Sequence, residues 1–336
     1  MLQVILIPNM RYFIYGSGAV GGTIGARLHL IGCEVTLIAR GKHLEVIREK
    51  GLSFIDPEKE HNLKIPVIES PMESAISADD VVILCMKSQD TQEALDVLSS
   101  VASPETPIVC AQNGVNNERL AIRYFQNVYG MLVVLPVSHL EPGEVVASSA
   151  PITGILDLGR FPNGVDDICK GVASDLRDAS FRSEARQEIM PWKYTKLIRN
   201  LFNAVDAILG LEGDVDAEIR QDFSTLLQRA REEGDACLAA AGIDRVSDEA
   251  FLERFKTFSA VSREGAAARQ GSSSWQSLKR GTGSVEASYL NGEIVMLGRL
   301  FGIATPVNLA LQETVERLAR EGISPGSLTL ADINFN

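Results

Sequence analysis

The stretch that decides the fold of this chain is Gly16-Ser17-Gly18-Ala19-Val20-Gly21-Gly22, which follows the apolar run Tyr12-Phe13-Ile14-Tyr15. A helix-like segment, residues 23–28, comes next, so the order is strand, G-x-G-x-x-G and helix. The first glycine of such a motif permits a tight turn, the second lets the backbone approach a pyrophosphate, and the third lets helix and strand pack closely. The phosphates would lie at the helix N-terminus, where unpaired N–H groups point outward.

A second strand follows where a βαβ unit requires it, at residues 34–39. We therefore expect the motif to bind a dinucleotide rather than to be a structural glycine turn. An NAD-binding fold ordinarily carries Asp or Glu at the end of this strand, for the ribose 2′-hydroxyl. Here the position is Arg40, which favours a 2′-phosphate and hence NADP(H), although a basic turn is also common on any solvated surface.

Composition narrows the class of protein. A length of 336 residues suggests about two domains, and 45% hydrophobic residues are enough for buried cores. The net charge of −12 argues against sequence-independent binding of nucleic acid or of an anionic membrane. We expect a soluble cytoplasmic protein with neither nucleic acid nor membrane as partner.

The cysteines and histidines predict neither a disulfide framework nor a metal site. The number of cysteines is odd, they stand far apart, and most lie in apolar runs, so we expect reduced, buried thiols. They are Cys33, Cys85, Cys110, Cys169 and Cys237. The four histidines have no ligand spacing and no acidic cluster beside them.

The first nine residues are apolar but lack the charged region and length of a signal peptide. Because Arg11 begins the first strand directly after Met10, we interpret residues 1–9 as an upstream extension, with the true start at Met1 or Met10 left open. A frayed terminus is the plain alternative.

Two polar segments end neighbouring strands of the expected parallel sheet. The continuous apolar run of residues 80–86 ends in Lys87-Ser88-Gln89, and the strand of residues 107–111, after a helix at 91–100, ends in Gln112-Asn113-Gly114. Both ends lie at the carboxyl edge of the sheet, where doubly wound folds bind ligands.

The rest of the chain divides into a strand-rich and a helical part. Residues 52–55 and 64–67 predict a hairpin-like insertion with a turn at 56–59, and residues 128–158 predict strands that extend the sheet in antiparallel fashion. Beyond Met190 helical spacing dominates, at residues 192–209, 217–241, 248–258, 285–300 and 309–321. We expect a Rossmann-type α/β domain at 1–187, which binds NADP, and an all-α domain at 188–336 for substrate binding or dimerisation.

A polar stripe marks the first helix of the second domain. Lys196 and Asn200 are four residues apart, and Asn203 is seven from Lys196, an angular offset of about 20°. Such a stripe either faces water or lines a pocket.

A polar loop at residues 272–281 leads into the predicted helix at 285–300. Glu286 lies in the first turn of this helix, where the macrodipole stabilises a carboxylate. Taken alone, this spacing indicates helix capping.

Together these segments resemble the ketopantoate reductase family, the 2-dehydropantoate 2-reductases. The resemblance runs nearly end to end, through residues 16–22, 87–89, 112–114, 196–200, 286–292 and 297–308. It implies a Rossmann domain joined to a helical domain of the 6-phosphogluconate-dehydrogenase-like kind. It also implies NADPH-dependent reduction of ketopantoate to pantoate, in pantothenate biosynthesis.

The resemblance also implies roles for individual residues. Lys196 would protonate the new alkoxide, Glu286 would support this lysine and the substrate, and Asn200 would bind a substrate hydroxyl. Lys193, one turn before Lys196, is a rival general acid, but the spacing to Asn200 fits Lys196. Asn113 would hold lysine and substrate in place, and Ser273 or Ser274 would meet the substrate carboxylate. The implied cofactor-binding residues are Gly16, Ser17, Gly18, Ala19, Val20, Gly21, Arg40, Lys87, Gln89 and Asn113.

Three departures from the family pattern leave the substrate open. The second helix asparagine of the family falls at Ala204, with Asn203 one place early. Ser277 follows the loop glutamine, Gln276, where the family has an acidic residue, and one extra residue between this loop and Glu286 leaves open whether Ser273 or Ser274 is the serine match. The alternatives are a reductase of another 2-oxo acid and a catalytically silent NADP(H)-binding regulator, and a homodimer is left open. Lys196 and Glu286 together favour an enzyme.

Overall fold

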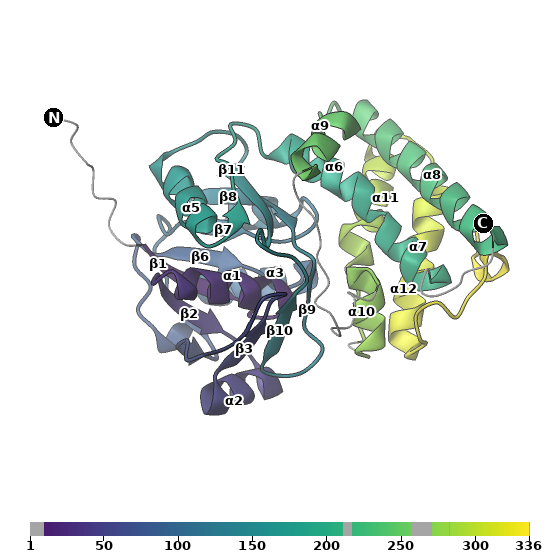
Figure 1. The fold of residues 1–336 in the computed structure, drawn as a ribbon. Helices are drawn as coiled ribbons and strands as arrows, with labels where there is room; N and C mark the ends of the chain where they lie inside the picture. The colour runs from purple at the N-terminus through teal and green to yellow at the C-terminus, as the bar shows by residue number, and fades with distance from the viewer. Residues whose placement is uncertain (1–9, 211–216, 257–270, 282, 336) are drawn as a thin grey trace. The chain divides into compact units, whose positions relative to one another are not determined.

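The structure is a computed structural model that describes residues 10–210, 217–256, 271–281 and 283–335 (Figure 1). The chain forms two compact units. The first comprises residues up to Gln112, Asn116–Met190 and the segment that begins at Leu252. The second comprises Asn113–Val115, Pro191–Phe251 and the segment from Gln270 to the C-terminus.

The first unit is built on an eight-stranded sheet of order β12-β11-β8-β7-β6-β1-β2-β5. Its strands are β1 Arg11–Tyr15, β2 Glu34–Ile38, β5 Val67–Ile68, β6 Val81–Leu84, β7 Ile108–Cys110, β8 Val128–Val134, β11 Gly154–Arg160 and β12 Phe181–Arg182. All neighbours pair in parallel except β8 and β11. The antiparallel extension is thus confirmed for β11, whereas β8 itself runs parallel to β7.

Apolar side chains fill both faces of this sheet. Tyr12 and Ile14 of β1 belong to one buried cluster, together with side chains of α1 Ala19–Leu30 and α5 Asp167–Asp178. Phe13, between them, points into a second cluster with side chains of α3 Thr91–Ser99 and α4 Asn117–Ala121. This alternation along β1 is what a doubly wound fold requires, because successive side chains of a strand point to opposite faces. The remaining helix of the unit is α2 Gly41–Lys50.

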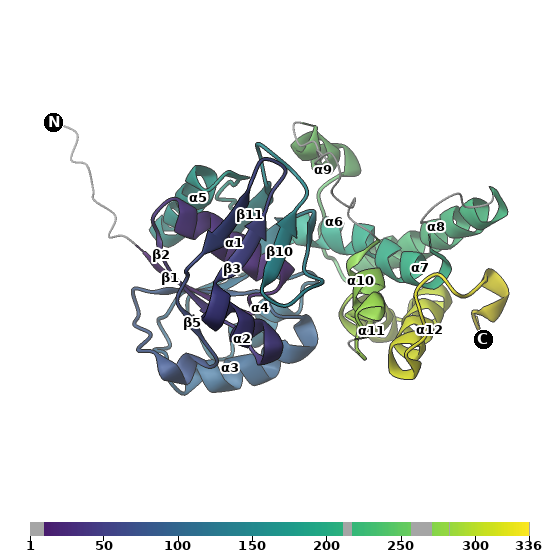
Figure 2. The same ribbon diagram turned by 60° about the horizontal axis from the view of Figure 1, so that its bottom comes forward.

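A second, four-stranded sheet of order β4-β3-β10-β9 packs over α1 (Figure 2). Its strands are β3 Leu52–Ile55, β4 Glu60–Leu63, β9 Val137–Ser138 and β10 Glu144–Ala147. The predicted hairpin exists, but its return strand begins at Glu60 rather than Lys64. The reason is the tight turn closed by Asp56, whose carboxylate accepts the backbone N–H groups of Glu58 and Lys59 at 2.9 and 2.8 Å.

The described part of the second unit contains helices and no strand. They are α6 Met190–Asn200, α7 Phe202–Leu209, α8 Ala217–Ala240, α10 Ser273–Lys279, α11 Asn291–Phe301, α12 Pro306–Glu321 and the first half of α9 Asp248–Phe255, whose residues from Leu252 onward belong to the first unit. Short 3₁₀ turns lie at Pro71–Glu73 and Ser88–Asp90 in the first unit and at Ala287–Tyr289 and Leu330–Asp332 in the second. The fold class predicted from the sequence is confirmed. The end of the helix predicted at 248–258 lies partly outside the described residues.

Three predictions about these helices were wrong. The helix of residues 192–209 is interrupted at Leu201, and the helix expected from Val285 begins only at Asn291, because Leu290 has a non-helical backbone (φ −112°, ψ −86°). Most of the predicted polar loop at residues 272–281 is helix α10, Ser273–Lys279. Its cap is Ser272, whose hydroxyl accepts the N–H of Trp275 at 3.3 Å, and Trp275 is buried.

The five cysteines are free thiols, as expected from their spacing. The expected burial is confirmed for Cys110, Cys169 and Cys237 but was wrong for Cys33 and Cys85, which are partly exposed. In the described part of the chain, no helix is both long and apolar enough to cross a membrane.

Candidate active site

The glycine-rich loop between β1 and α1 contains two glycines at which a Cβ would clash with neighbouring atoms. Gly16 has a φ of +94°, and a Cβ on it would lie 2.6 Å from the backbone nitrogen of Met86. A Cβ on Gly21 would lie 2.2 Å from the carbonyl oxygen of Gly16. These close approaches are the tight turn and the helix–strand packing that the motif predicts.

Gly18 differs, because the space beside it is open. The nearest atom to a Cβ at Gly18, Cδ2 of His139, would be 3.9 Å away. Gly18 is also the N-cap of α1, with no side-chain cap and no acidic residue in the first turn, which Ala19, Val20 and Gly21 form. A helix N-terminus of this kind presents unpaired N–H groups and positive dipole charge. The residues present therefore fit a dinucleotide pyrophosphate.

Arg40 lies just beyond the end of β2, at the N-cap of α2. Its side chain is 78% exposed, and its guanidinium lies 3.1 Å from the carboxylate of Asp90, which follows Lys87 and Gln89 in the loop after β6. An exposed ion pair of this kind contributes at most about 1 kcal/mol. A phosphate could therefore displace the carboxylate at little cost.

A buried polar network holds the two loops that carry Lys87 and Asn113. The Gln112 side-chain amide donates to the carbonyl of Met86 at 2.9 Å and to the hydroxyl of Thr91 at 2.8 Å. Thr91 donates to Asn117 at 3.0 Å, whose amide donates to Ser88 at 3.2 Å. Our reading of the sequence missed Thr91 and Asn117, because the pairing depends on two strands being neighbours.

Asn200 and Asn113 meet although 87 positions separate them. The side-chain amide of Asn200 donates to Oδ1 of Asn113 at 3.1 Å. Lys196 lies one turn before Asn200 on α6 and is half-buried. Lys193, the rival lysine, is only 3% exposed.

Asn203 and Ser273 form a second polar pair. The Asn203 amide donates to the Ser273 hydroxyl at 3.1 Å, and Ala204 is buried beside it with 2% exposure. Helix α10 is held on α7 by Asp206, whose carboxylate accepts the N–H of Ser272 at 2.8 Å. The sequence analysis did not identify Asp206. Ser274, the other serine expected near the substrate carboxylate, is buried, with 4% of its surface exposed.

Glu286 is not in the first turn of α11. It precedes the 3₁₀ turn Ala287–Tyr289, and its own carbonyl accepts the N–H of Tyr289 at 3.0 Å. Because α11 starts five residues later, the dipole of that helix does not explain a carboxylate at this position. Glu286 is half-buried.

The described residues contain no group of three or more His, Cys, Asp or Glu side chains that could hold a metal ion. The doubly wound sheet, the glycine-rich loop at the N-terminus of α1 and the helical second unit define a dinucleotide-dependent oxidoreductase. Residues 12–163 match the family described as ketopantoate reductase PanE/ApbA, and residues 188–319 match its C-terminal part. The chain belongs to this family, an enzyme family of 2-oxo acid reductases that use a nicotinamide cofactor.

Relatives of known name are similar over almost the whole chain. The 2-dehydropantoate 2-reductase of Archaeoglobus fulgidus is 30% identical, covering 91% of this chain and 96% of the relative. That of Pyrococcus horikoshii is 28% identical, covering 95% and 100%.

Solved structures give the same result. A PanE/ApbA family ketopantoate reductase from Ralstonia eutropha superimposes with a TM-score of 0.76 at 27% identity, covering 93% of this chain and 99% of that chain. D-mandelate dehydrogenase, solved with NADH and anilino(oxo)acetate, gives 0.78 at 23% identity, covering 93% and 99%, and this likeness concerns the fold alone. The family resemblance inferred from the motifs is confirmed.

Proposed function

We propose that the protein reduces 2-dehydropantoate (ketopantoate) to pantoate with NADPH. The observation that carries the proposal is the contact between Asn113 and Asn200, at 3.1 Å. These are two of the residues expected to hold substrate, and they come from segments far apart in the sequence. Relatives that match over at least nine-tenths of the chain are 2-dehydropantoate 2-reductases, which supports the same substrate.

In this proposal residues 1–187 bind the cofactor and residues 188–336 bind the substrate. The pyrophosphate lies at Gly18 and the first turn of α1, and Arg40 takes the 2′-phosphate because its guanidinium is exposed. Lys87 and Gln89 contact the cofactor from the loop after β6. When bound, NADPH supplies a hydride to the keto carbon of the substrate.

The proposed acid is Lys196. An ammonium beside the keto oxygen stabilises the negative charge that develops there, and then donates its proton to give the 2-hydroxy acid. Glu286 supports the ammonium. Asn200 binds a substrate hydroxyl, and Asn113 fixes Asn200 through the hydrogen bond between their side chains.

The carboxylate of the substrate is assigned to Ser273. Its hydroxyl accepts from the Asn203 amide, so the hydrogen of that hydroxyl can be donated to an anion. Ala204 favours the alternative of another branched or aromatic 2-oxo acid, because a buried methyl stands where the family has an asparagine.

The test follows NADPH absorbance with a panel of 2-oxo acids that includes ketopantoate. We expect the highest kcat/KM with ketopantoate. A higher kcat/KM with an aromatic or other branched 2-oxo acid would identify that acid as the substrate, while the proposed type of reaction would stand. No oxidation with any acid, together with NADPH binding, would favour the silent regulator.

A further inference from the structure

His43, on helix α2, contacts the backbone of the glycine-rich loop. Its Nε2 lies 2.9 Å from the carbonyl oxygen of Ser17, and the backbone N–H of Gly143 donates to its Nδ1 at 2.8 Å. Gly143 belongs to the turn before β10, and its own carbonyl accepts from the N–H of Ser53 in β3 at 2.8 Å. One imidazole thus joins the loop, α2 and the small sheet.

The Gly143 N–H and the Ser17 carbonyl determine which tautomer the His43 ring adopts. A backbone N–H can only donate, so Nδ1 of His43 must present its lone pair to Gly143, and the hydrogen must be on Nε2. Nε2–H then donates to the carbonyl of Ser17. A second proton on Nδ1 would face the N–H of Gly143. Burial and the neighbouring ring of His139, 4.3 Å away between centroids, lower the pKa of His43 to about 4.

The surroundings leave this ring little freedom. Gly143 has a φ of +83°, and a Cβ on it would lie 2.2 Å from a methyl carbon of Val46 on α2. The turn backbone is therefore pressed against the helix that carries His43. The His139 ring is also fixed, by a hydrogen bond between its Nδ1 and the carbonyl oxygen of Glu144 at 2.8 Å.

The hydrogen bond to Ser17 determines where the next N–H group points. The Ser17–Gly18 peptide is trans, since the cis bonds of the described chain precede Pro151 and Pro162. In a planar trans peptide the C=O and the following N–H point in opposite directions. With the Ser17 carbonyl held by His43, the N–H of Gly18 points the opposite way. The N–H groups of Gly16 and Ser17 donate instead to the carbonyl of Ile38, at 3.1 and 3.3 Å.

We propose that His43 is a positioning residue for the cofactor: a neutral imidazole that orients the Ser17–Gly18 peptide so that the Gly18 N–H meets the pyrophosphate. This inference rests on the proposed binding of NADPH at this loop. Because His43 acts on the resting shape of the loop, its loss should weaken cofactor binding and leave turnover at saturation nearly unchanged.

Three substitutions separate the two hydrogen bonds of the ring. His43→Gln places an N–H donor near the position of Nε2, His43→Asn keeps an acceptor near Nδ1 for Gly143, and His43→Phe keeps only the ring. His29→Gln, on α1, is the matched control. Dissociation constants for NADPH are measured by fluorescence titration, and kcat is measured with NADPH and the 2-oxo acid saturating.

We expect Gln to bind NADPH within about threefold of the native chain, and Asn and Phe at least about tenfold more weakly, the scale of one lost hydrogen bond. All three should keep kcat within about twofold. Asn or Phe binding as the native chain does would overturn this inference alone, and so would Gln binding as weakly as Asn. A native chain that binds neither NADPH nor NADH would overturn the proposed function, and this inference with it.

Discussion

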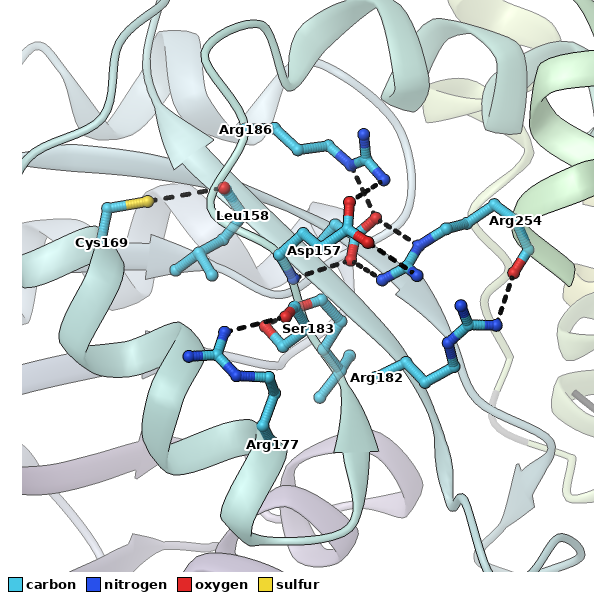
Figure 3. A network of polar contacts seen from close by, with 10 residues as sticks. Asp157, Leu158, Cys169, Arg177, Arg182, Ser183, Arg186 and Arg254 are labelled. Carbon is cyan, nitrogen blue, oxygen red and sulfur yellow. Dashed lines mark hydrogen bonds and ion pairs between the residues drawn. The ribbon is translucent and has the colours of Figure 1, made fainter. Parts of the chain in front are cut away.

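Arg254 of α9 forms a bidentate ion pair with the carboxylate of Asp157 in β11 (Figure 3). The Asp157 side chain is fully buried. The distances are 2.6 and 3.0 Å, and Arg186 adds a third hydrogen bond to the same carboxylate at 2.7 Å. A buried charge of this kind is tolerated only when its partners are present, because desolvation is costly. The pair therefore ties residues 252–255, the part of α9 that belongs to the first unit, to the sheet of that unit.

Removing that charge should destabilise the first unit strongly. We expect Asp157→Asn to lower its free energy of unfolding by about 3 kcal/mol, because the buried Arg254 guanidinium would lose its buried counter-charge and keep only the half-exposed carboxylate of Glu184, 3.0 Å away. Denaturant unfolding measures this. Glu253→Gln, on the same helix, is the control, since Glu253 pairs with Lys256 at the surface and its loss should cost less than about 1 kcal/mol. Equal effects would refute the special role of Asp157.

If Lys196 is the general acid, Lys196→Ala should lower kcat at least about a hundredfold, the usual scale for such groups. NADPH affinity should stay nearly native. Lys193→Ala tests the rival lysine one turn earlier, which is buried at 3% exposure. Steady-state kinetics and cofactor titration on both variants decide between them, and near-native turnover of Lys196→Ala would remove it from the mechanism.

Cofactor choice should depend on Arg40. We expect Arg40→Ala to weaken NADPH binding by at least about tenfold more than NADH binding, since only NADPH carries the 2′-phosphate. Asp90→Asn should act in the opposite sense, because it removes the carboxylate that lies 3.1 Å from the guanidinium. Paired titrations with both cofactors measure the ratio. Equal losses for NADPH and NADH would show that Arg40 does not read the phosphate.

Stability should depend on pH through His43. Its pKa is lowered to about 4 in the folded chain, by burial and by His139, from an ordinary value of 6.5. Between these values the unfolded chain binds the extra proton and the folded chain does not, so stability is lost as pH falls from about 6.5 to about 4. His43→Gln should flatten this dependence. Unfolding midpoints of both proteins at pH 7.5 and pH 5 check it, and parallel losses would contradict the assignment.

The sequence predicted what local patterns encode. Apolar runs and the glycine motif were enough for the strands β1, β2, β6 and β7 and for their parallel order. The second sheet was not predictable, because β10 pairs in parallel with β3 from a distant part of the chain. The helix break at Leu201 likewise has no neighbouring glycine or proline to mark it.

The same distinction between local patterns and distant partners applies to the candidate site. Lys196, Asn200 and Asn203 are visible as a stripe with helical spacing, although the helix is interrupted between Asn200 and Asn203. The partners that hold site residues come from other segments and have no local signature. Asp157 shows the difficulty: it lies inside an apolar strand, and Arg254 follows 97 positions later.

Asn203 provides the last test, because it stands beside the position where the family asparagine is missing. Its amide donates to the Ser273 hydroxyl at 3.1 Å, so we expect Asn203→Ala and Ser273→Ala each to raise the KM for the 2-oxo acid about tenfold, with a smaller effect on kcat. If the two residues act as one unit, the double variant should cost clearly less than the sum of the single changes.

The control for this cycle is Ser327→Ala, which removes one hydrogen bond of an exposed serine, to Ser324, and should leave KM unchanged. Additive effects of Asn203→Ala and Ser273→Ala would mean that each residue meets the substrate separately. A native KM in Asn203→Ala would place this amide outside the pocket, and Ala204 would then mark a real loss of a substrate contact.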